Sequence, residues 1–129
     1  MFRNVLLLGL LAALPGCGVA ESSGVDAGDA QVIQALKEAG SNLSKPHPID
    51  FYFVEFADRA SAERFERDWD QAHWKLDVHQ MPGLSEWTVI ASTVMVPDLQ
   101  AISDLSARFN VLAPKYGADY DGWEAAVTQ

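Results

Sequence analysis

Cysteine is almost absent from this sequence: Cys17 is the only one among 129 residues. A single cysteine excludes a disulfide within one chain, so stability must come from a packed core. Basic residues are also few, with nine lysines and arginines against 18 aspartates and glutamates and a net charge of −9. Affinity for phosphates depends on lysine and arginine, so nucleic acid is a poor partner and a basic protein surface a better one.

Motifs for catalysis and for cofactor binding are missing as well. The sequence contains no Gly-x-Ser-x-Gly nucleophile elbow and no glycine-rich phosphate loop. Its three histidines, His47, His73 and His79, do not repeat at the spacing of metal ligands, and no second cysteine supports them. We therefore expect no catalytic residues, no metal and no cofactor, and we predict that the protein is not an enzyme.

The apolar run at the N-terminus is too short to anchor the chain in a membrane. Val5–Leu14 is ten residues long and interrupted only by Gly9, whereas a spanning helix needs about 20 apolar residues. The run follows Arg3, the only early positive charge, and ends in small residues. A charged start, a short apolar run and a small-residue site are typical of a secretory signal. We predict a signal peptide over residues 1–16.

The end of this leader, Leu14-Pro15-Gly16-Cys17, resembles the lipobox of bacterial lipoproteins. Leu14, Gly16 and Cys17 match the pattern, and Pro15 departs from it. We predict lipid attachment at Cys17, a flexible tether over residues 17–28, and a membrane-anchored domain on the extracytoplasmic side of the bacterial cell envelope. The alternative is an unprocessed leader that keeps Cys17 as a buried thiol and the protein in the cytoplasm.

Residues 29–129 have the periodicity of one folded domain, with turn residues between the periodic segments. Asp29 is predicted to cap a short helix, Pro97 to open a later helix in its first turn, and Pro114 to end that helix. The predicted helices cover residues 30–39, 58–73 and 97–113, and the predicted strands cover 49–56, 74–80, 86–96 and, as a strand or turn, 118–126.

After the short N-terminal helix, the order of these elements is βαββαβ. This order predicts an α+β fold of the ferredoxin-like type, with a four-stranded antiparallel sheet and two helices on one face. Aromatic residues gather on two strands of this sheet, and at least half of them are expected in the core. Any on the open face would indicate a protein contact or a homodimer seam, because an RNA-reading sheet also needs a basic face. These aromatic residues are Phe51, Tyr52, Phe53, Phe56 and Trp87.

Several stretches resemble the family of regulators of ribonuclease activity B (RraB). They are Leu36–Pro46 leading into Ile49–Phe53, then Met95–Leu99, and finally Tyr116–Glu124. The resemblance covers about residues 32 to 127. It implies a ferredoxin-like fold and a non-enzymatic domain that binds ribonuclease E and inhibits it.

The most specific part of this resemblance is the run Tyr120-Asp121-Gly122-Trp123-Glu124. These five residues are the candidate partner-binding residues. A structural role is the favoured alternative, in which Gly122 permits a turn and Tyr120 and Trp123 pack it. Asp121 and Glu124, together with Asp119, could form a paired-carboxylate site, but acids in a polar turn are more often simply solvated.

The two resemblances conflict over location, because ribonuclease E is cytoplasmic and a lipidated Cys17 would hold the domain outside the cytoplasm. We expect an RraB-like protein-binding or regulatory domain carried on a lipoprotein, with a protein partner of unknown identity. The alternative is an envelope lipoprotein that binds another partner or ligand and has no role in ribonuclease regulation.

Overall fold

The computed structural model describes residues 5–7, 27–69 and 72–129 of the chain. Cys17 lies outside these ranges, as does most of the predicted signal peptide and tether, so lipid attachment stays a prediction. Within the described ranges, no helix combines the length and apolar character needed to cross a membrane.

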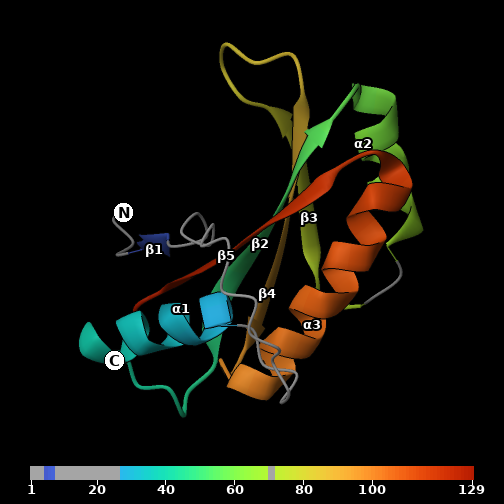
Figure 1. The fold of residues 1–129 in the computed structure, drawn as a ribbon. Helices are drawn as coiled ribbons and strands as arrows, with labels where there is room; N and C mark the ends of the chain where they lie inside the picture. The colour runs from blue at the N-terminus through green and yellow to red at the C-terminus, as the bar shows by residue number, and fades with distance from the viewer. Residues whose placement is uncertain (1–4, 8–26, 70–71) are drawn as a thin grey trace.

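Five antiparallel strands form one sheet, and four of them make up the predicted ferredoxin-like motif (Figure 1). The fifth, β1, is a short edge strand that pairs with β5 and falls inside the predicted leader, where no strand was expected. The first strand of the motif, β2, lies between β5 and β4. In spatial order the strands are β1 (Val5–Leu7), β5 (Asp119–Ala126), β2 (His47–Phe56), β4 (Trp87–Met95) and β3 (Lys75–Gln80).

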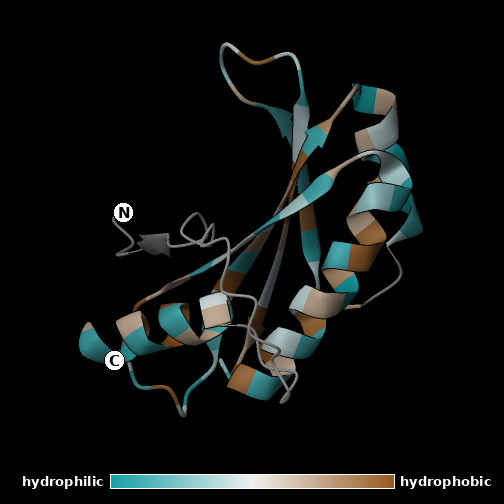
Figure 2. Cartoon of the chain, viewed as in Figure 1, coloured by the Kyte–Doolittle hydropathy of each residue, from teal (hydrophilic) through white to brown (hydrophobic). Residues whose placement is uncertain are grey.

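Helices α2 (Arg59–Asp68) and α3 (Leu99–Leu112) cover one face of the sheet, which confirms the predicted layering (Figure 1). Helix α1 (Ala27–Glu38) crosses one end of this layer and contacts α3. In Figure 2 hydrophobic and hydrophilic residues are mixed along the strands, and α2 and α3 also alternate between hydrophilic and hydrophobic along their length. That alternation is typical of helices with one buried face.

The core lies between the sheet and the helices and is built on the inward face of β2. Phe51, Phe53 and Phe56 are fully buried there. The rings of Phe51 and Phe53 lie 5.3 and 5.0 Å from the ring of Phe109 on α3, and Phe53 lies 4.7 Å from Phe65 on α2. Burying each such ring stabilises the fold by about 1.5–3 kcal/mol, so this strand joins both helices to the sheet.

Two predicted helix starts are wrong by a few residues. Helix α1 begins at Ala27, so the tether predicted to reach residue 28 ends earlier, and Asp29 is buried within the first turn. Helix α3 begins at Leu99, because the side chain of Asp98 caps it by accepting the N–H of Ala101 at 2.9 Å. Pro97 therefore precedes the cap and does not occupy the first turn. A cap needs a side-chain acceptor, which aspartate has and proline lacks.

Helix α2 ends at Asp68, five residues before the predicted end at His73. Trp69 leaves the helix with an extended backbone (φ −72°, ψ 119°). Its ring then packs 5.1 Å from Trp74 and 5.6 Å from Phe109. The helical pattern continues in sequence past this point, but tertiary packing of the indole overrides it.

The C-terminal part of the domain follows the prediction more closely. Helix α3 gives way to a 3₁₀ helix, η1 (Ala113–Tyr116), which contains Pro114. Gly117 then takes a left-handed backbone (φ 72°) and ends it. The segment predicted as a strand or turn is the strand β5.

Candidate functional site

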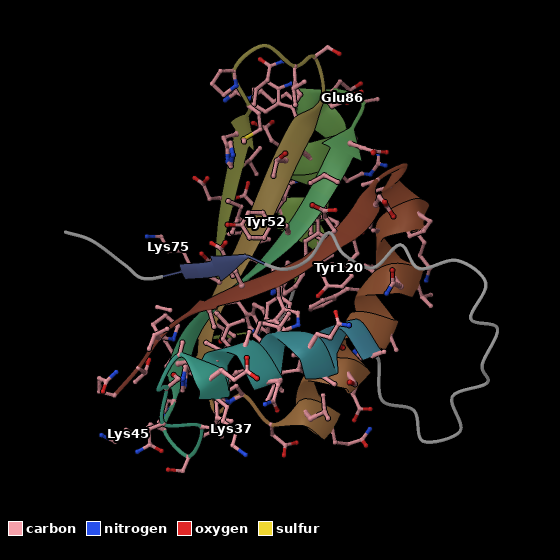
Figure 3. All side chains as sticks on the ribbon, turned by 60° about the vertical axis from the view of Figure 1, so that its left-hand side comes forward. Lys37, Lys45, Tyr52, Lys75, Glu86 and Tyr120 are labelled. Atoms are coloured by element: carbon pink, nitrogen blue, oxygen red, sulfur yellow. The ribbon has the colours of Figure 1, made fainter. Side chains whose placement is uncertain are left out.

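The sheet face opposite the helices contains a concave groove of about 640 Å³. Among the described residues, no helix covers this face (Figure 1). The groove is formed by β2, β4, β5 and the end of β3, together with the turn that joins β3 to β4. In Figure 3, Glu86 marks the turn end of the groove and Tyr52 lies nearer the middle of the sheet.

Part of the groove is apolar. Val54 and Ile90 come from the neighbouring strands β2 and β4 and are half-buried. Met81 and Leu84 come from the β3–β4 turn, which is closed by a hydrogen bond from the Leu84 N–H to the Met81 carbonyl at 3.1 Å. The side chains of Met81 and Leu84 are 44% and 54% exposed. Two exposed large apolar side chains beside a concave apolar surface are typical of a contact region.

Three carboxylates, those of Glu55, Glu86 and Asp121, also line the groove, and two of them are placed there by β-bulges. The pairing of β2 with β4 is shifted between Phe53 and Phe56, and Glu55 lies in this bulge with a left-handed backbone (φ 68°). In β5, Tyr120 and Gly122 are opposite successive residues of β2, so Asp121 is the extra residue of a second bulge. Bulges redirect side chains next to binding sites, and here they bring both carboxylates to the groove.

The groove is electrostatically negative. Partial burial raises the pKa of Asp121, and the charges of Asp119 and Glu55 raise it further. Within the described part of the chain, no hydrogen bond or ion pair engages the side chains of Glu55, Glu86 or Asp121. Among the described residues that line the groove, only a histidine, His79, can carry positive charge.

Tyr120 and Trp123 of the candidate motif belong to the helix side of the sheet. Trp123 is 2% exposed, and its Nε1–H donates to Oδ1 of Asp29 on α1 at 2.9 Å. Ser106 of α3 donates to the same oxygen at 3.1 Å. Tyr120 packs its ring 5.4 Å from Phe53. These two aromatic residues therefore connect β5 to α1 and α3, as the structural interpretation predicts.

The other three motif residues lie on or support the open face. Gly122 has a φ of 110°, which is accessible to glycine, and it completes the bulge within β5, not the predicted turn. Glu124 accepts a hydrogen bond from the hydroxyl of Tyr52 at 2.6 Å, across from β2. Asp121 faces the groove. Asp119, Asp121 and Glu124 are therefore strand residues and not turn acids: the charge of Asp119 acts on Asp121, whereas Glu124 is bonded to Tyr52.

The three histidines are also separate. His47 is buried and contacts Ser41, with 2.5 Å between its Nε2 and the Ser41 Oγ, whereas His73 lies in the turn before β3. His79 places Nδ1 2.8 Å from Oδ2 of Asp77. Among the described residues, no three histidine, cysteine, aspartate or glutamate side chains are grouped to hold a metal ion.

Glu55, Glu86, Met81 and Leu84 were not among the binding residues predicted from the sequence. One pattern could have indicated the first. Apolar aromatic residues alternate at Phe51 and Phe53 and then recur at Phe56, one residue late. That offset in a strand is typical of a bulge, which places the preceding residue on the opposite face.

Replacing Trp123 by phenylalanine should destabilise the domain more than the same change at Trp69. Both changes remove similar ring volume from the core, but only Trp123→Phe removes a donor from the buried Asp29 carboxyl group. The indole N–H of Trp69 has no partner among the described residues. The extra loss should be about 1–3 kcal/mol in the free energy of unfolding, measured with urea. Equal losses would contradict a bonding role for Trp123.

Asp121→Asn should stabilise the folded domain at neutral pH. The pKa of Asp121 is raised above its ordinary 3.8, so the folded state holds this proton more tightly than the unfolded chain does. Stability is therefore lost as pH rises through the window between 3.8 and the raised pKa. The urea midpoint of the variant should exceed that of the original chain at pH 7, and the two should converge below that window. Asp104→Asn on α3 is the control, and a gain independent of pH would refute the assignment.

The comparison with protein families agrees with this geometry. The family model described as "Regulator of ribonuclease activity B" (RraB) matches residues 26–125. This range includes α1, the four motif strands apart from Ala126, and all the residues that line the groove. No curated protein sequence matches the chain. Because the family model covers most of the sequence, the chain belongs to the RraB family.

Proposed function

We propose that this protein regulates a ribonuclease by binding it, with no catalysis of its own. The observation that carries the proposal is the extent of the family match, which spans the folded domain from α1 to β5. The groove on the open sheet face supplies a surface suited to a protein contact. It combines exposed apolar side chains with carboxylates that have no partner among the described residues.

The proposed target is ribonuclease E, which the resemblance to the family implies. A regulator that acts by binding needs an accessible surface and no reactive centre. In the described part of the domain, the open face of the sheet is such an accessible surface. Occupying a region of the ribonuclease that positions RNA or a partner protein would then lower the rate of RNA cleavage.

Adding the purified protein to ribonuclease E should slow the cleavage of a labelled RNA, and the two proteins should co-elute in gel filtration. An unrelated ribonuclease treated in the same way controls for effects on the RNA itself and should be unaffected. Unchanged cleavage by ribonuclease E at about 10 μM of the protein, together with separate elution, would refute ribonuclease E as the target.

A second candidate function is that of an envelope lipoprotein that binds a different partner. The sequence Leu14-Pro15-Gly16-Cys17 after a short apolar run favours it, because lipid on Cys17 would hold the domain outside the cytoplasm. In that location, the domain and ribonuclease E would not meet.

Comparing the native chain with Cys17→Ala separates the two candidates. If the leader is processed, the native chain should enter the detergent-extracted membrane fraction and gain acyl mass, and Cys17→Ala should lose both. A full-length chain in the cytoplasm with an unmodified Cys17 would refute the lipoprotein proposal and leave ribonuclease E as the leading target. Mass spectrometry of the intact protein distinguishes these outcomes.

A further inference from the structure

We propose that the groove on the open sheet face binds a cationic peptide segment of the protein partner. An arginine or lysine of that segment lies between Glu55 and Asp121, and a neighbouring apolar side chain lies against Met81 and Leu84. The inference rests on the proposed protein-binding function and names the chemistry of the partner that this function leaves open.

The shape of the groove favours a peptide segment. Its apolar residues come from the central strands and from the β3–β4 turn, whereas Glu55 and Asp121 come from the two bulges. A segment that follows the groove can therefore meet both kinds of surface within a few residues. A volume of about 640 Å³ accommodates a few side chains.

The charge of the groove determines the sign of its ligand. The pKa of Asp121 is raised first by its partial removal from water and then by the nearby charges of Asp119 and Glu55. A guanidinium or ammonium group between Glu55 and Asp121 would relieve this repulsion and supply hydrogen-bond donors to both carboxylates.

The backbone of Glu55 supports the same ligand. Its φ of 68° is uncommon for residues other than glycine, and glycine would adopt it without strain. The glutamate nonetheless occupies the bulge with no ion pair or hydrogen bond to its carboxylate within the described residues. The carboxylate is exposed to solvent and therefore available to a ligand from outside the fold.

The same charges disfavour the other occupants. RNA would bring phosphates against the carboxylates of the groove, and a chain of net charge −9 has little basic surface to compensate. A second copy of the chain packed through this face would bring carboxylates opposite carboxylates. The homodimer seam considered from sequence is therefore the weaker use of this surface.

The test measures binding of fluorescein-labelled peptides to the full chain carrying Cys17→Ala, by fluorescence anisotropy. The probes are a ten-residue peptide of alternating arginine and leucine, a charge-matched peptide of arginine and glycine, and a peptide of alternating glutamate and leucine. The arginine–leucine peptide should bind best, the arginine–glycine peptide more weakly, and the glutamate–leucine peptide not detectably. Equal binding of the two arginine peptides would refute the apolar contact.

The double variant Glu55→Gln/Asp121→Asn should weaken binding of the arginine–leucine peptide about tenfold, because it removes both carboxylates that pair with the arginine side chains. The control double variant Glu66→Gln/Asp104→Asn, in α2 and α3, changes the net charge equally and should alter binding less than twofold. Leu84→Ser should weaken binding, and Val111→Ser, at a similarly exposed apolar residue of α3, should not. Equal losses in the two double variants would show attraction by net charge alone and overturn the inference.

Glu55→Gly keeps the proposal testable if another variant folds poorly. Glycine adopts the left-handed backbone at this position without strain, so the urea midpoint of unfolding should stay the same or rise. Binding of the arginine–leucine peptide should nevertheless weaken. Unchanged binding would overturn the inference. So would a concentration-dependent dimer, measured by analytical ultracentrifugation, that Leu84→Ser dissociates and that excludes the peptide.

The same variants separate this inference from the proposed function. If Glu55→Gln/Asp121→Asn still inhibits ribonuclease E as the original chain does, the groove inference fails and the proposed function stands. If the groove binds the cationic peptide while ribonuclease E is neither bound nor inhibited, the ribonuclease E assignment fails and the groove inference stands.

Discussion

The alternation of side chains along β2 is the constraint on which the rest of this structure depends. β2 lies between two strands of the motif, β5 and β4, and its inward residues Phe51 and Phe53 contact both α2 and α3. Its outward residues, Tyr52 and Val54, form part of the groove. A shift of one residue in its register would exchange the two sets and lose both the core and the groove.

The two bulges direct aromatic side chains that stabilise the domain to the helix side of the sheet and carboxylates available for binding to the open face. Without the bulge in β5, simple alternation could not place both Tyr120 and Trp123 on the helix side of the sheet, because they are three residues apart. With it, both rings face the helices and Asp121 faces the groove. Glu55 occupies an equivalent position in β2 at the cost of a strained backbone. Strain that the fold does not need is most often found where a protein meets a ligand.

Periodicity in the sequence was sufficient to predict the fold class, the order of the strands and helices, and the helix end near Pro114. It was insufficient for the end of α2, because Trp69 satisfies a helical pattern yet packs across the core. The motif around Asp121 was recognised, but its division between the two faces depends on a bulge that pairs residues distant in sequence. The turn residues Met81 and Leu84 carry no periodic pattern that could have indicated a shared groove with Glu55.

The short strand β1 gives the outer edge of β5 a partner at Glu124–Ala126. If the chain is cut before Cys17, this partner is released with the leader, and the backbone N–H and C=O groups along that edge become open to pairing. The precursor would then have this edge of β5 paired within its own chain, whereas the processed chain could pair the same edge with a strand of another chain.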